Sequence, residues 1–194
     1  MKNKIAKIIR IITVPPLMVA ALIIILYFQR PDIFRGVADY AVALIFLGLF
    51  PVMVYPIWAV VPKLKEKGRE GQRNLAFVGT LIGYTFAFLY GEFSGASPEL
   101  KLIFRSYFIA VILLTFVNKV LKKRASGHAC SVVSPALFLC FFVGWRTLPV
   151  CILMISASFW GSLALKRHKP ADLISGSIVC TLSFISAYLM YSIF

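Results

Sequence analysis

Residues 102–124 of the chain read LIFRSYFIAVILLTFVNKVLKKR, an apolar run that ends in a basic cluster. A helix needs about 20 apolar residues to cross the ~30 Å hydrocarbon core of a bilayer. The same alternation of apolar run and polar or basic break recurs along the chain and gives the following candidate spans: Ile11–Phe28, Ala38–Val61, Leu75–Gly91, Leu102–Val120, Ala129–Val143, Leu148–Leu165 and Leu173–Phe194. The sequence therefore predicts an all-α fold, a polytopic transmembrane helical bundle of six or seven helices.

The composition excludes an ordinary water-soluble domain. Of the 194 residues, 60% are hydrophobic and 14% are charged, and so much apolar surface exceeds any core that a chain of this size can bury. No internal repeat or long linker divides the sequence, so we expect a single membrane domain, residues 1–194. The cysteines lie in or beside apolar runs without C-x-x-C spacing, which favours buried small hydrophobic side chains. The first span lacks a cleavage signal and is expected to be retained.

The formal net charge of +14 suits a nucleic-acid partner, but the placement of the charges argues against one. If the N-terminus is cytoplasmic, 16 of the 21 Lys and Arg residues fall on that side. They are Lys2, Lys4, Lys7, Arg10, Lys63, Lys65, Lys67, Arg69, Arg73, Lys119, Lys122, Lys123, Arg124, Lys166, Arg167 and Lys169. The positive-inside rule then predicts an integral protein of the cell membrane with a cytoplasmic N-terminus and an external C-terminus, although a ligand can also require some of these charges.

The sequence holds two histidines, and both stand at junctions between a basic loop and an apolar run. His128 and His168 are separated by an even number of predicted crossings, so both should lie on the cytoplasmic face. Ser126 is a favoured N-cap for a helix that starts at Gly127, and Pro170 is favoured in the first turn of the last helix. Two helix N-termini and the neighbouring cations would together suit a phosphate group.

His168 and Asp172 are four residues apart, a spacing that brings the two side chains together across one turn of helix. A carboxylate bonded to one ring nitrogen fixes the tautomer and leaves the other nitrogen able to attack phosphorus. His128 would then supply a proton to the departing oxygen. This set predicts phosphoryl transfer through a phosphohistidine, with no metal and no cofactor, since the cations and helix ends neutralise the phosphate.

Each feature also has an ordinary explanation. A His-x-x-x-Asp pair at a helix start arises by chance, and Ser-Gly-His can be a cap followed by an interfacial histidine. The basic runs can be markers of the cytoplasmic side and nothing more. The phosphate-site hypothesis depends on both histidines falling in these patterns on one face.

These residues resemble the type 2 phosphatidic acid phosphatase superfamily of membrane lipid phosphatases. The family's second motif, Pro-Ser-Gly-His, is similar to residues 125–128, with Ala125 in place of proline. Its third motif is Ser-Arg, five residues, His, three residues, Asp, and it is similar to the segment from Gly161 to Asp172. Gly176 follows where the family often has glycine. The resemblance covers residues 102–176, the phosphatase-like motif region.

The chain departs from the family pattern at two places. Ser162 stands where the third motif carries an arginine, and Lys166 or Arg167 is a candidate substitute. The first motif, lysine, six residues, Arg-Pro, is absent, and a basic run that ends at Arg124 lies directly before Ser126. This resembles small microbial members in which the loop between the first two motifs is very short.

The resemblance implies a metal-independent phosphatase that hydrolyses a lipid or prenyl phosphate or diphosphate through a phosphohistidine. His168 would be the nucleophile, Asp172 its orienting partner and His128 the general acid. The implied phosphate ligands are Arg124, Ser126, Gly127, Arg167, Lys119 and Lys123. Two alternatives stay open: an inactive relative that binds or transports a phosphorylated lipid, and a structural membrane subunit whose histidines lie at the interface.

Overall fold

In the computed structural model, residues 2–62 and 68–193 are described, and within them every regular element is a helix. The elements are α1 (Lys2–Ile12), α2 (Pro15–Gln29), η1 (Pro31–Ile33), α3 (Val37–Ala43), η2 (Leu44–Leu49), α4 (Phe50–Val60), α6 (Gly68–Phe93), α7 (Pro98–Thr115), η3 (Phe116–Val120), α8 (Gly127–Phe142), η4 (Trp145–Thr147), α9 (Leu148–Ala164) and α10 (Pro170–Ile193). The predicted all-α bundle is confirmed.

The helices are long and apolar enough for a membrane protein. Within the described ranges, five segments can cross a bilayer by length and composition: Val37–Val60, Asn74–Phe93, Pro98–Val120, Trp145–Ala164 and Pro170–Ser192. A sixth is added if α1 and α2 are counted as one bent span, and α8 is a shorter apolar helix of 16 residues. The protein is therefore an integral membrane protein.

The predicted first span is wrong at its start. The sequence suggested a helix from Ile11, but the chain breaks after α1, and α2 begins at Pro15 with its axis bent by 54°. Pro15 and Pro16 lack the backbone N–H that would continue α1, and proline is well placed in the first turn of a new helix. The result is a short amphipathic α1 that lies across the end of the bundle against α9.

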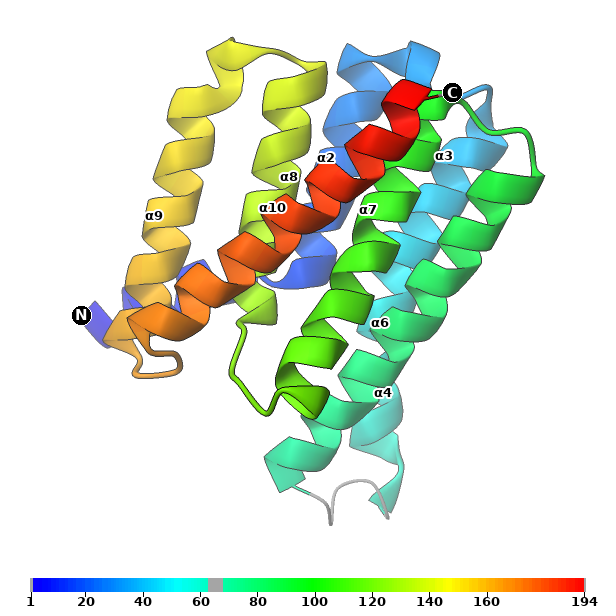
Figure 1. Cartoon of the computed structure of the whole chain (residues 1–194). Helices are drawn as coiled ribbons and strands as arrows, with labels where there is room; N and C mark the ends of the chain where they lie inside the picture. The colour runs from blue at the N-terminus through cyan, green and yellow to red at the C-terminus, as the bar shows by residue number, and fades with distance from the viewer. Residues whose placement is uncertain (1, 63–67, 194) are drawn as a thin grey trace.

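α7 lies at the centre of the bundle, between α6 and α10 (Figure 1). α8 packs against α2, α9 and α10. Phe104 of α7 and Phe138 of α8 are fully buried between these helices. Ile152 and Leu153 of α9, by contrast, are largely exposed, as expected for side chains that face lipid rather than water.

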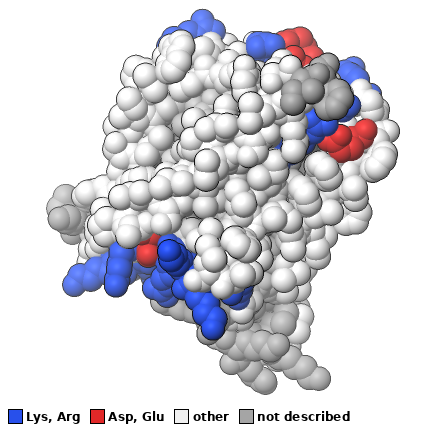
Figure 2. Space-filling model, in the orientation of Figure 1, with Lys and Arg blue, Asp and Glu red and all other residues white. Residues whose placement is uncertain are grey.

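Charged side chains gather at the two ends and leave the middle of the visible surface uncharged (Figure 2). What we call the basic end is formed by α1, the 121–126 connection and the 165–169 turn; the opposite end is formed by η1, the 94–97 loop and η4. The predicted alternation of basic loops is therefore present in the described part. Lys63, Lys65, Lys67 and Phe194, which the topology prediction also used, lie outside the described residues.

Candidate active site

The start of α8 is fixed by Ser126, as the sequence predicted. The Ser126 hydroxyl accepts a hydrogen bond from the Ala129 backbone N–H at 3.2 Å, and the Ser126 N–H donates to the Asp172 carbonyl at 2.9 Å. A Cβ atom at Gly176 would lie only 2.2 Å from the Ser126 carbonyl oxygen. The absence of a side chain at Gly176 therefore lets the first turns of α8 and α10 touch, and this contact brings the two motif regions together.

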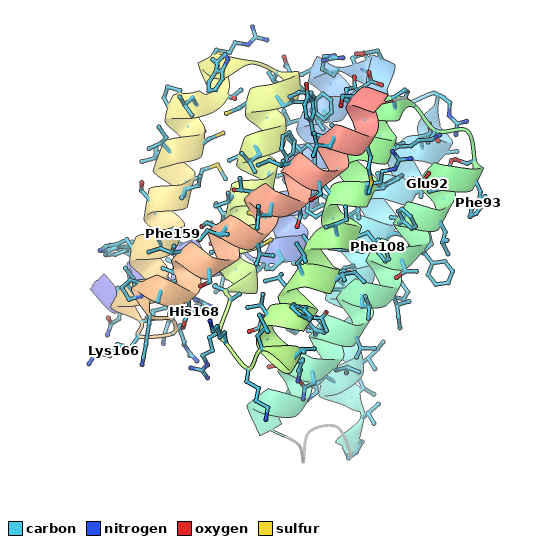
Figure 3. All side chains as sticks on the ribbon, in the orientation of Figure 1. Glu92, Phe93, Phe108, Phe159, Lys166 and His168 are labelled. Carbon is cyan, nitrogen blue, oxygen red and sulfur yellow. The ribbon has the colours of Figure 1, made fainter. Side chains whose placement is uncertain are left out.

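Hydrogen bonds to the end of α9 and to the start of α10 fix the turn between the two helices. Lys166 takes the left-handed conformation, with φ of 51°, and its N–H donates to the Leu163 carbonyl at 2.9 Å. The N–H of Arg167 donates to the Ser162 carbonyl at 3.0 Å, which completes a Schellman cap on α9. On the other side, the Asp172 carboxylate accepts the Lys169 N–H at 3.0 Å. These contacts fix the position of His168 between two helix ends (Figure 3).

The imidazole of His168 lies between a hydroxyl and a carboxylate. Its Nε2 atom is 3.4 Å from Ser126 Oγ, and its Nδ1 atom is 3.7 Å from Asp172 Oδ2. Asp172 is buried, whereas the side chain of His168 is 25% exposed. The carboxylate thus faces Nδ1 and favours the tautomer with a proton there, so that Nε2 carries the lone pair. The structure thus brings His168 and Asp172 together, as their spacing of four residues predicted.

A solvent-open pocket of about 450 Å³ lies in front of His168. It is lined by Arg124, Leu163, Lys166, Arg167, His168, Lys169, Pro170 and Asp172. Four of these side chains are Lys or Arg, and Asp172 is the one carboxylate among them. Guanidinium and ammonium groups in such a concave site favour a multiply charged anion, above all one with several oxygen acceptors.

His128 takes a position that the sequence did not predict. It is buried, does not line the pocket, and places Nε2 3.1 Å from Oγ1 of Thr13, at the junction of α1 and α2. The Thr13 hydroxyl donates its one hydrogen to the Ile9 carbonyl at 2.8 Å, so it accepts from the imidazole and places a proton on His128 Nε2. His128 remains within electrostatic reach of His168 and Arg10.

The predicted phosphate ligands divide into two groups. Arg124 and Arg167 line the pocket, Ser126 contacts His168, and Gly127 is exposed in the first turn of α8. Lys119 and Lys123 do not line the pocket. The Lys119 ammonium instead donates to Asn74 Oδ1 of α6 at 3.1 Å, and Lys123 is exposed on the connecting loop.

Comparison with protein-family models, with curated proteins and with solved structures gives no match. Within the described ranges, no three His, Cys, Asp or Glu side chains are grouped so as to share a metal ion. The chemistry of the pocket is therefore inferred from its own geometry and from the sequence motifs.

Two N-terminal residues, Arg10 of α1 and Thr13 directly after α1, contact residues of the predicted motifs and were not predicted from the sequence. Arg10 donates from Nη1 to the hydroxyl of Ser162 at 3.1 Å, and Thr13 contacts His128 as described. The Arg10 guanidinium thus contacts Ser162, the residue at the position where the motif of the resembled family carries arginine, while Lys166 and Arg167 line the pocket. The sequence spacing could have indicated these contacts. Ala6, Arg10 and Thr13 are four and three residues apart and therefore lie on one face of an amphipathic segment.

A third missed residue is Asn118, which closes the connection before Ser126. Its side-chain amide donates to the Ala125 carbonyl at 3.1 Å and accepts the Ala125 N–H at 3.2 Å. This two-way contact positions the loop that carries Arg124. An asparagine one turn before a basic loop carries no distinctive sequence signal.

Proposed function

We propose that the protein is a membrane phosphatase that hydrolyses a lipid or prenyl phosphate or diphosphate through a phosphohistidine on His168. The observation that carries the proposal is the imidazole of His168 at the wall of a cationic pocket, with Asp172 on its Nδ1 side and Ser126 on its Nε2 side. The resemblance to the type 2 phosphatidic acid phosphatases supports the same assignment.

The pocket supplies the binding step. The four cations of the lining are available to hold the phosphate oxygens: Arg124, Lys166, Arg167 and Lys169. The N-terminus of α8, where Gly127 is exposed, adds the partial positive charge of a helix end. Leu163, which is also in the lining, offers an apolar surface beside the charged groups for the start of a lipid tail.

The chemistry takes two displacements at phosphorus. In the first, Nε2 of His168 bonds to phosphorus while the bond from phosphorus to the lipid oxygen breaks, and the departing oxygen takes a proton. Asp172 stabilises the positive charge that develops on the ring, since it faces the Nδ1–H. In the second, water attacks the phosphohistidine, inorganic phosphate leaves and the neutral imidazole is restored. His128 is the proposed proton donor. In this role its ring must leave Thr13 and contact the departing oxygen instead.

We infer the orientation in the membrane from the charge distribution. With the basic end in the cytoplasm of a cell membrane, the site works on lipids of the inner leaflet and the C-terminus lies outside. Cysteines introduced at Lys123 and Arg146 test this with a membrane-impermeant maleimide on intact cells. Labelling at position 146 alone is expected, and labelling at position 123 alone would reverse the orientation.

The function is tested with purified protein in detergent, assayed on a panel of lipid and prenyl phosphates and diphosphates. Turnover is expected to persist in EDTA, because Asp172, His128 and His168 are too few to complete a coordination shell. Loss of turnover in EDTA with recovery on adding magnesium would contradict the phosphohistidine scheme. Labelled phosphate should be trapped on the protein when the reaction is quenched without acid.

A second function is favoured by one observation, the turning of His128 away from the pocket onto Thr13. A protein without a proton donor at the leaving oxygen would bind a phosphorylated lipid, or carry it across the membrane, without hydrolysing it. The same panel separates the two, since this alternative requires tight binding of a lipid phosphate with no release of inorganic phosphate.

A further inference from the structure

The guanidinium of Arg10 belongs to α1 and is not among the groups that line the pocket, but it lies within electrostatic reach of one of them, Arg167. Its Nη1 atom donates to the hydroxyl of Ser162, which is fully buried near the end of α9. The carbonyl of the same Ser162 accepts the N–H of Arg167, a residue of the pocket lining. One residue of α9 therefore connects the N-terminal helix to the pocket wall.

Arg10 is also held close to other positive charges. It is partly buried, and Arg167 and His128 both lie within its electrostatic reach. Among the described side chains, Arg10 makes no ion pair. The carboxylate of Asp172 faces His168 and accepts the Lys169 N–H instead. A partly buried guanidinium beside a second arginine is unfavourable unless an anion joins them.

We propose that Arg10 is a phosphate-contacting residue of this site, supplied by α1 and positioned by the Ser162 hydroxyl. The inference rests on the proposed function for the identity of the anion, and it adds a ligand from outside the two motif loops. A phosphate between Arg10 and Arg167 would receive charge-assisted hydrogen bonds from both and would relieve their repulsion. α1 then becomes a structural part of the binding site.

The position of α1 indicates which phosphates the site receives. Ile5, Ile8 and Ile12 are exposed on α1 together with Lys4 and Lys7, the pattern of a helix that lies in a membrane interface. Arg10 therefore holds its anion at the depth of the lipid headgroups. This favours a phosphate attached to a lipid over a free soluble phosphate ester.

The test uses the full chain in lipid nanodiscs and two readouts, binding of orthovanadate measured by calorimetry and hydrolysis of a lipid phosphate. Arg10→Ala is expected to weaken vanadate binding about tenfold to a hundredfold, the range for loss of a hydrogen bond to a charged group. Arg10→Lys should retain part of the affinity. Lys7→Ala, a change on the exposed side of the same helix, is the matched control and should alter binding less than about twofold.

A relocated arginine separates phosphate contact from a merely structural role. In Arg10→Ala with Ser162→Arg, the guanidinium returns to the same place from α9, and vanadate affinity should recover in part. Failure of this rescue, in a double variant that melts at the temperature of the unmutated protein, would overturn the assignment.

The two proposals fail in different ways. If the unmutated protein hydrolyses no lipid phosphate but binds vanadate in an Arg10-dependent manner, the phosphatase proposal is wrong and Arg10 is still an anion ligand. If hydrolysis is observed and both Arg10→Ala and Arg10→Lys leave vanadate affinity unchanged, the inference about Arg10 is wrong.

Discussion

The two ends of the bundle differ in how far their Lys and Arg side chains are paired with acidic side chains. At the opposite end three arginines are neutralised: Arg30 pairs with Asp32 at 2.6 Å, Arg35 with Asp39 at 2.8 Å, and Arg105 with Glu92 at 2.6 Å. The hydrogen bond from Arg30 lowers the pKa of the Asp32 carboxyl from its usual value. At the basic end, four Lys and Arg side chains of the pocket share one lining carboxylate.

This difference shows which charges are structural. The acid partners at the opposite end complete hydrogen-bonded pairs within the protein, so little is left for a ligand to satisfy. The basic end carries an excess that intramolecular contacts do not remove, and the same groups surround a polar pocket. An anion from outside would balance it.

The largest expected effect comes from removing the proposed nucleophile at the basic end. His168→Ala should lower kcat by about a thousandfold or more, because no other group replaces the covalent step. Binding of inorganic phosphate should change little, since the cations of the pocket remain. The measurement is turnover of a lipid phosphate, with Arg146→Ala at the opposite end as the control. Near-normal turnover by His168→Ala would rule out the phosphohistidine.

The next effect concerns the contact that brings the two motif regions together. Gly176→Ala should destabilise the fold by about 1–3 kcal/mol and lower activity, because its Cβ would push against the Ser126 carbonyl and separate α8 from α10. Thermal unfolding in detergent measures the change. Gly36→Ala is the matched control, since Gly36 has no atom within 4 Å of its Cβ position. Equal melting temperatures for the two variants would contradict the close approach.

A smaller effect is expected from breaking an ion pair at the opposite end. Glu92→Gln removes the charge that faces Arg105, whose side chain is only 16% exposed, and should cost about 1–2 kcal/mol of stability. The KM for a lipid phosphate should not change, because the pair plays no part in binding. A changed KM at normal stability would show that the two ends of the bundle are coupled.

The smallest effect tests the loop that precedes Ser126. Lys122 has φ of 52°, a conformation that glycine adopts without steric cost. Lys122→Gly should therefore raise stability by about 0.5–1 kcal/mol, whereas Lys123→Gly next to it should lower it slightly. Thermal unfolding of both variants decides the question, and the opposite order would contradict the backbone geometry of the loop.

The parts of the fold that the sequence predicted are those decided locally. Apolar runs of sufficient length became helices, and Ser126 and Pro170 mark helix starts because a cap and a proline act on their own backbone. The break before Pro15 was missed because the apolar run continues across it from Ile11. Hydropathy alone does not separate an interfacial helix from the span that follows it.

The site was predicted to the extent that it depends on spacing. His168 and Asp172 meet because four residues make one helical turn, whereas the contact of Arg10 with Ser162 joins residues 152 positions apart. The directions of Lys119, toward Asn74, and of His128, toward Thr13, are likewise set by neighbouring helices. No local pattern fixes the direction of such side chains.

The location of Arg10 has a consequence for the synthesis of the protein. The ribosome produces α1 first, but Ser162, against which Arg10 is held, is made about 150 residues later. During that interval α1 has no partner in α9, and its amphipathic surface lets it rest on the membrane. The pocket is completed only when α9 and α10 have been inserted. A nascent chain therefore lacks the assembled site until α9 and α10 have been made, and fragments 1–120 and 121–194 would have to be produced together to form it.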